Sequence, residues 1–190
     1  MKIAIISDTH DNVPNLEKAL AWMKENNIEQ LIFCGDLCAP SILKEVIAPN
    51  FPGAVHMVFG NVEDRELTPK VAGQFKNIKH YGDQGEMEID GKKAAFAHYP
   101  ELAKKLAETG KYDFVFYGHN HRAWTEKIGQ TELLNPGTLA GMFAKATFAV
   151  WDTKTGELEL KILEKLSLTP LPLSQRARGK TKRQLILLSF

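Results

Sequence analysis

Three short apolar segments near the start of the chain constrain its fold more than any other feature. They cover residues 2–7, 31–35 and 55–60, and polar or glycine-bearing sequence follows each of them. A strand that is apolar on both faces is typical of a parallel sheet covered on both sides. We therefore predict that these segments are parallel strands of an α/β protein.

The sequence between these strands is predicted to be helical. Residues 13–27 place apolar side chains at the spacing of one helix face, at Leu16, Ala19, Leu20 and Met23. Residues 40–48 are expected to form a short helix, because Pro40 suits a first helical turn. The first part of the chain thus predicts a βαβαβ unit.

After residue 60 the pattern changes toward antiparallel strands. Residues 85–90 and 92–98 predict a hairpin with a tight turn at Asp90 and Gly91. Further along, we expect a helix over 100–109 and strands over 113–118, 124–128, 131–135, 147–152 and 158–163. Two sheets packed face to face and flanked by helices would accommodate both parts of the chain.

Composition narrows the class of protein. The chain has 190 residues, of which 44% are apolar and 25% charged, the profile of a soluble globular protein. No window approaches the ~18–20 apolar residues that a membrane span needs, so no membrane partner is expected. The first apolar run is shorter than a signal-peptide core and ends at Asp8, which favours a cytoplasmic protein. Cys34 and Cys38 are expected to be reduced thiols, with a metal or redox role as the alternative.

Charge divides the chain into two parts. Residues 166–190 carry five basic residues and no acid, which leaves 19 basic against 23 acidic residues in 1–165. We therefore expect one domain over 1–165 and a basic, poorly ordered tail over 166–190. An acidic body argues against nucleic-acid binding as the main activity, although the cluster at 176–183 could make weak, salt-sensitive contacts.

Potential metal ligands follow almost every predicted buried strand. Residues two apart in extended chain point the same way, so Asp8 and His10 can grip one ion, as can His119 and His121. The carboxyl ends of strands are also where open α/β sheets bind their ligands. The remaining candidates at these ends are Asp36, Asn61 and His98. Each alone could be a helix cap or a chance pair, but together they indicate a metal centre. We interpret His56 and His80 as structural or surface residues.

The order of these residues resembles a known family. Asp8-x-His10, Gly35-Asp36, Gly60-Asn61, His98 and Gly118-His119-x-His121 are similar to the motifs of the calcineurin-like metallophosphoesterases. The likeness is greatest to the small single-domain bacterial and archaeal phosphodiesterases, whose Asn-Pro-Gly-Ser/Thr turn matches residues 135–138. The resemblance covers residues 1–165. It implies a four-layer α/β/β/α sandwich, in which two mixed sheets pack face to face and carry a two-metal site.

The resemblance also implies a role for each ligand. Asp8, His10 and His121 would hold the first metal, Asn61, His98 and His119 the second, and Asp36 would bridge them. Asp36, Asn61 and His98 would take part in catalysis, in which a hydroxide shared by the ions attacks phosphorus. Imidazole, carboxylate and amide ligands without thiolate suit two divalent transition-metal ions, manganese first, with iron, nickel or zinc as alternatives.

Two positions depart from the family pattern and a third matches it. Val62 stands where many members have a histidine that protonates the leaving oxygen. Glu63 matches the acid that follows it. Tyr99 replaces the glycine that usually follows the histidine at 98. We expect Tyr99 and Glu63 to contact substrate.

The sequence therefore predicts a metal-dependent hydrolase that acts on a small phosphodiester, with a homo-oligomer left open. The alternative is a catalytically weak metal-binding scaffold, similar to the retromer subunit of this family. The absence of a proton donor at Val62 favours the scaffold, whereas a complete ligand set argues against it.

Overall fold

The apolar strands at the start of the chain form the centre of a six-stranded sheet. The computed structural model describes residues 1–167. The strand order is β11-β10-β1-β2-β3-β4, in which β1 to β4 run parallel, β10 pairs antiparallel with β1, and β11 pairs antiparallel with β10. The strands are β1 (Lys2–Ile6), β2 (Gln30–Phe33), β3 (Ala54–Met57), β4 (Ile78–His80), β10 (Thr147–Asp152) and β11 (Leu158–Ile162).

The middle of the chain forms a second, five-stranded sheet in the order β5-β6-β7-β9-β8. Strands β6, β7 and β9 run parallel, and an antiparallel strand closes each edge. The bounds are β5 (Gln84–Ile89), β6 (Lys92–Ala97), β7 (Phe114–Phe116), β8 (Trp124–Ile128) and β9 (Thr131–Asn135). Both sheets are mixed, as predicted.

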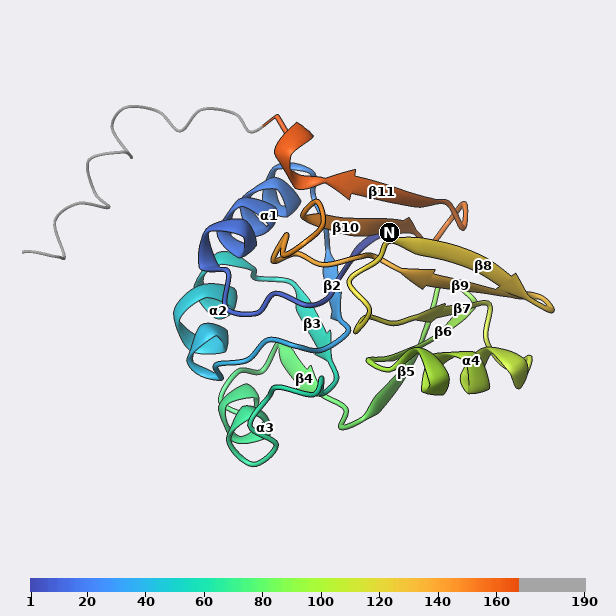
Figure 1. The fold of residues 1–190 in the computed structure, drawn as a ribbon, viewed down its shortest axis with the longest axis horizontal. Helices are drawn as coiled ribbons and strands as arrows, with labels where there is room; N and C mark the ends of the chain where they lie inside the picture. Colours follow the sequence, from blue (N-terminus) through green and yellow to red (C-terminus); the bar gives the residue numbers. More distant parts are fainter. Residues whose placement is uncertain (168–190) are drawn as a thin grey trace, which may run out of the picture.

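Helices cover the outer faces of the two sheets (Figure 1). Helix α4 (Pro100–Glu108) packs on the second sheet. The first sheet is covered by α1 (Val13–Glu25), a π-helical turn η1 (Leu43–Ile47) that runs into α2 (Ala48–Asn50), and α3 (Leu67–Ala72). A 3-10 turn, η2 (Leu163–Lys165), follows β11. The predicted four-layer α/β/β/α sandwich is confirmed.

Strand β1 shows why the sequence is apolar on both faces. Ile3 and Ile5 face the second sheet and pack near Trp151, whereas Ala4 and Ile6 face the helices. These four residues of β1 and Trp151 are fully buried. Large apolar side chains thus fill the layer between the sheets, and the polar side chains of the site lie at the strand ends.

The structure corrects the predicted organisation in three places. Helix α3 and strand β4 were not predicted, and the second helical segment runs over residues 41–50 rather than 40–48. The hairpin of β10 and β11, which the sequence did not assign to either sheet, pairs with β1 in the first. The cluster at 176–183 lies outside the described residues. Within residues 1–167, no helix is long and apolar enough to cross a bilayer.

Candidate metal centre

The carboxyl ends of parallel strands from both sheets meet at one edge of the sandwich. Asp8 and His10 follow β1, Asp36 follows β2, and Asn61 follows the segment after β3. From the second sheet, His98 follows β6, while His119 and His121 follow β7. The structure brings all seven predicted ligands together, in two adjoining groups.

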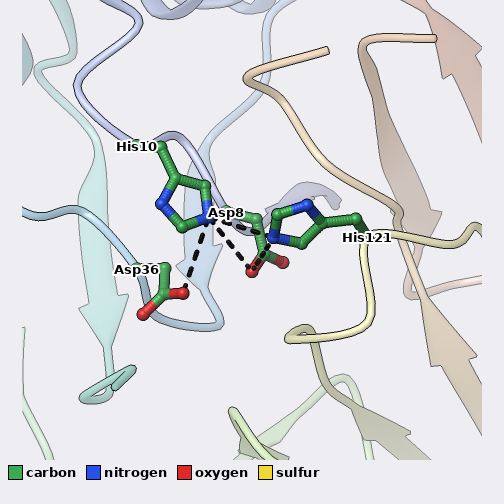
Figure 2. A group of neighbouring side chains, drawn as sticks. All are labelled: Asp8, His10, Asp36 and His121. Carbon is green, nitrogen blue, oxygen red and sulfur yellow. Dashed lines mark hydrogen bonds and ion pairs between the residues drawn. The ribbon is translucent and has the colours of Figure 1, made fainter. Parts of the chain in front are cut away.

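The first group contains Asp8, His10, Asp36 and His121, and each contributes one ligand atom within 4.8 Å of the others. Figure 2 shows the two imidazoles facing each other, with the carboxylates beside them. The Nε2 atoms of His10 and His121 are 3.0 Å apart. Nε2 of His121 lies 3.3 Å from Oδ1 of Asp8, and Nε2 of His10 lies 3.6 Å from Oδ2 of Asp36.

The second group contains Asn61, His98 and His119. Oδ1 of Asn61 lies 3.1 Å from Nε2 of His98 and 2.9 Å from Nδ1 of His119. Those two ring nitrogens are 3.2 Å apart. Three atoms with lone pairs therefore converge on one small region, as ligands of a single ion do.

Asp36 belongs to both groups. Its Oδ2 atom is 3.6 Å from His10 Nε2 in the first group and 3.5 Å from His98 Nε2 in the second. Its Oδ1 atom accepts the backbone amides of Asn61 and Val62 at 2.7 and 3.2 Å. One carboxylate oxygen is thus used to fix the side chain, and the other faces the space between the two groups.

The backbone adopts unusual conformations to aim these side chains. Five of the seven candidate ligands have positive φ, which L-residues rarely adopt: Asp8, His10, Asp36, His119 and His121. Strain of this kind clusters at functional sites. Gly60 allows the close approach that fixes Asp36, because a Cβ atom there would lie 2.0 Å from Oδ1 of Asp36.

A buried carboxylate oxygen that accepts no hydrogen bond indicates that a cation fits the centre. Asp8 is fully buried, and among the described residues its Oδ1 atom has no hydrogen-bond donor. Burial, reinforced by the nearby Asp36 carboxylate, raises the pKa of Asp8 to about 7. An unpaired charge in this position is costly unless an ion compensates it. The donor set, imidazole nitrogens with carboxylate and amide oxygens, fits divalent transition metals.

Two histidines of the centre are also set up as neutral ligands. Burial lowers the pKa of His98 and of His121. The Nδ1–H group of His98 donates to the carbonyl oxygen of Cys34 at 2.8 Å, which leaves the Nε2 lone pair directed at the centre. Such a contact from the distal ring nitrogen is a common feature of metal-binding histidines.

Glu63 lies below the centre and fixes two of its loops. Its side chain is buried, and its carboxylate oxygens accept the backbone amides of Leu37 and Gly60. These amides adjoin Asp36 and Asn61 in sequence. The arrangement favours a positioning role over the substrate contact expected from the sequence. The sequence signal for this role is an acidic residue two positions after the Gly60-Asn61 turn.

The other candidates lie around the centre or away from it. Tyr99 is half-exposed, with its ring centroid 4.9 Å from that of His119, so it borders the second group. Val62 is 45% exposed beside Asn61. His56 and His80 lie outside both groups, as expected. Cys34 and Cys38 are free thiols, and Sγ of Cys38 contacts His10 at Nδ1, not at the Nε2 atom that faces the centre.

The turn at residues 135–138 supports the centre in a way that the motif alone did not reveal. The Thr138 hydroxyl donates to the Asp8 carbonyl at 2.9 Å. The amides of Leu139 and Ala140 donate to the carbonyls of Ser7 and Asp8, each at 3.0 Å. The chain just before β10 is thereby tied to the first ligand loop.

A family model matches residues 1–156 and describes a calcineurin-like phosphoesterase superfamily domain. The chain belongs to this superfamily. As a calcineurin-like phosphoesterase it is a metal-dependent hydrolase, and the predicted family, fold and enzyme class are confirmed.

Individual relatives agree with the family. The chain is 31% identical to phosphodiesterase MJ0936 of Methanocaldococcus jannaschii over 86% of its own length and all of that protein. The structure of a novel archaeal phosphodiesterase is 28% identical in sequence to this chain and has a TM-score of 0.78, over 85% of this chain and 99% of the other. At 17% identity and a TM-score of 0.62, the Entamoeba histolytica Vps29–zinc complex shares the fold, over 89% of this chain and 96% of the other. The E. coli phosphoesterase Yfce has the same identity and TM-score, over 86% and 100%.

Proposed function

We propose that this calcineurin-like phosphoesterase is a phosphodiesterase that uses two divalent metal ions. The first would be held by Asp8, His10 and His121, the second by Asn61, His98 and His119, and both by Asp36. The small phosphodiester substrate is inferred from similarity to MJ0936, which is named as a phosphodiesterase.

The observation that carries this proposal is the position of Asp36 between the two groups of ligands. Its Oδ2 atom lies 3.5–3.6 Å from a ring nitrogen of each group. A carboxylate so placed can offset the mutual repulsion of two neighbouring cations. The Oδ1 atom of Asp8, which is buried and accepts no hydrogen bond, supports the same conclusion.

Two ions bound here would activate a water molecule and stabilise the negative charge that develops on the phosphoryl oxygens. The protein residues would orient the substrate and keep the ligand atoms fixed. His98 and His121 would bind as neutral imidazoles, and their lowered pKa values favour that form near neutral pH. Tyr99 borders the second group, and we infer that it would contact the substrate there.

Manganese is our first candidate for the metal, with iron, nickel and zinc as alternatives. The nitrogen and oxygen donors suit all four, and no thiolate belongs to either group. We infer a cytoplasmic location from the free thiols Cys34 and Cys38, which a reducing compartment maintains.

The rival function is a metal-binding scaffold without catalysis. The shared fold with Vps29 makes it worth testing, but a scaffold does not need seven convergent ligands, five of them on strained backbone. The discriminating experiment removes metal by chelation and returns Mn²⁺, Fe²⁺, Ni²⁺ or Zn²⁺ separately. Metal content and hydrolysis of bis(4-nitrophenyl) phosphate are then measured, with 4-nitrophenyl phosphate as the monoester comparison.

We expect two equivalents of metal and diester hydrolysis that exceeds monoester hydrolysis. Two bound equivalents without hydrolysis of either substrate, under any of the four metals, would favour the scaffold. Loss of activity in an Asp36→Asn variant that still folds would show that the hydrolysis belongs to this centre and not to a contaminant.

A further inference from the structure

The loop between β9 and β10 presents an aromatic side chain to solvent beside the metal centre. Phe143 is fully exposed, and its neighbour Met142 is 42% exposed. Phe143 also has φ 57°, in the left-handed region where a bulky residue is a genuine outlier. Exposure and strain at the same large apolar residue are not explained by packing within the described fold. They point to contact with a ligand.

The base of this loop is fixed to the first ligand strand. Besides the hydrogen bonds from residues 138–140 to Ser7 and Asp8, the amide groups of Asn12 and Asn15 donate to the Ala140 carbonyl at 2.8 and 3.2 Å. On the other side, Nζ of Lys145 pairs with Oε1 of Glu164 at 2.5 Å. The loop tip is therefore held in place relative to Asp8 by contacts at both ends.

A cavity of about 570 Å³ lies between this loop and the segment that follows β7. Two candidate metal ligands, His119 and His121, form part of its lining. Half of its other side chains are apolar (Ala123, Met142, Phe143 and Ala144), and the polar half includes the cations Arg122 and Lys145. Because His119 and His121 belong both to this lining and to the metal centre, the cavity adjoins the region where a substrate phosphorus would bind.

The charges of the cavity favour an anionic ligand with an apolar part. Lys145 is paired with Glu164, but Arg122 has no carboxylate partner within residues 1–167. Its guanidinium lies 5.7 Å from the ring centroid of Trp124. Arg122 lines both this cavity and a neighbouring one that contains Trp124, so its positive charge lies at the border of the cavity that Met142 and Phe143 line.

We propose that this cavity binds the ester substituent that stays on phosphorus during hydrolysis, and that it selects substituents that carry a flat aromatic ring. The proposal rests on the proposed phosphodiesterase function. Val62, where the family pattern places the donor to the leaving oxygen, does not line the cavity. The leaving group is therefore assigned to the Val62 side, and the retained group to the cavity. Phe143 and Met142 pack on the ring, and Arg122 attracts the anionic ester.

The test varies only the retained group. Phenyl 4-nitrophenyl phosphate and methyl 4-nitrophenyl phosphate release the same 4-nitrophenolate, so the ratio of their kcat/KM values in each variant reports the retained group. Phe143→Ala should lower the phenyl-to-methyl ratio by roughly tenfold, the effect of one lost aromatic contact with its buried area. Leu160→Ala is the matched control, since Leu160 is 46% exposed on β11 and does not line the cavity. It should leave the ratio unchanged.

A binding measurement separates failure of this proposal from failure of the proposed function. Phenylphosphonate and methylphosphonate are titrated by calorimetry into the manganese-loaded wild type and Phe143→Ala. If wild type binds phenylphosphonate more tightly than methylphosphonate, and Phe143→Ala removes this difference, the proposed role of the cavity is supported, even if neither diester is hydrolysed. Suppose that both diesters are hydrolysed with the same phenyl-to-methyl ratio in wild type and Phe143→Ala, and that the phosphonate affinities are equal. This result would disprove the proposed role of the cavity and leave the phosphodiesterase function supported. The latter result would assign the exposed loop to a macromolecular partner.

Discussion

The backbone amide of Asn61 donates to Oδ1 of Asp36 at 2.7 Å, so one candidate ligand orients another. The hydrogen bond joins the loops after β2 and β3, and it leaves Oδ2 of Asp36 as the oxygen that faces both ligand groups. Metal binding by this protein is therefore expected to be cooperative around Asp36, and the predictions below start from that residue.

Asp36→Ala is predicted to be the most damaging single substitution for metal content. It removes a ligand shared by both groups and the acceptor of two amides. We expect both metals to be lost, with affinity reduced by more than the ~10–100-fold typical of outer-shell changes. Metal analysis after gel filtration measures this, with Asp83→Ala, at an exposed ion pair, as control. Retention of both metals at wild-type affinity would disprove the bridging role.

Val62→His is predicted to speed the hydrolysis of alkyl esters more than that of aryl esters. Valine has no proton to give to a departing alkoxide, whereas a phenolate leaves without one. General acid catalysis contributes about 10²–10⁴-fold, so the gain should fall on diesters with poor leaving groups. Steady-state rates for matched alkyl and aryl diesters test this. Equal wild-type rates for the matched pair would contradict it. So would a change at Glu63, Asp64 or Tyr99 alone that slows alkyl hydrolysis at saturating metal and leaves aryl hydrolysis unchanged.

Glu63→Gln is predicted to weaken metal binding without removing a ligand. Glutamine keeps one acceptor oxygen but directs an NH₂ group at a backbone amide, so the loops of Asp36 and Asn61 lose a shared contact. We expect a ~10–100-fold loss of metal affinity and a loss of ~1–3 kcal/mol of unfolding free energy. Metal titration and denaturant unfolding of the metal-free protein measure these effects. Glu66→Gln, on an exposed residue, should change neither.

His80 is predicted to make the fold sensitive to acid. Burial lowers its pKa from 6.5 to about 4, with a smaller contribution from Arg65. Between these values the unfolded chain binds a proton that the folded chain does not, so stability falls as the pH drops from 6.5 to 4. His80→Gln should reduce the loss of Tm across this interval in chelator-treated protein. An unchanged pH dependence would show that other groups cause the acid sensitivity.

A chain that ends at residue 167 is predicted to keep the activity of the full chain. All seven candidate ligands and both sheets lie within residues 1–167. Any binding to single-stranded RNA or DNA should be confined to the full chain and should weaken steeply with salt, because it depends on the basic cluster at 176–183. Loss of diester hydrolysis in the shorter chain would assign the tail to the catalytic body.

The site could be predicted from sequence because each ligand sits at the end of a locally readable strand. Alternation, glycine turns and residue order placed His98 and His121 correctly even though they belong to the other sheet. Helix α3 escaped prediction because it has only six residues and contains Pro69. Strand β4 has three residues and depends on its pairing with β3.

Long-range contacts account for the remaining differences. The pairing of β10 with β1 joins Thr147–Asp152 to the first strand of the chain, and no local pattern encodes this choice of sheet. Glu63 was recognised from the motif, but its two amide contacts depend on the packing of separate loops. The strained φ of Phe143 has no sequence signature either, since phenylalanine rarely adopts it.

The division of the ligands between the two sheets has a consequence for how the molecule opens. Asp8, His10, Asp36 and Asn61 come from one sheet, while His98, His119 and His121 come from the other, all at the same edge of the seam. Bound ions would hold the two sheets together at that edge, so separation of the sheets would begin at the opposite edge. Amide hydrogens near Lys92 and Gly156, which border a cavity at that opposite edge, should therefore exchange first, and adding metal should slow exchange least there.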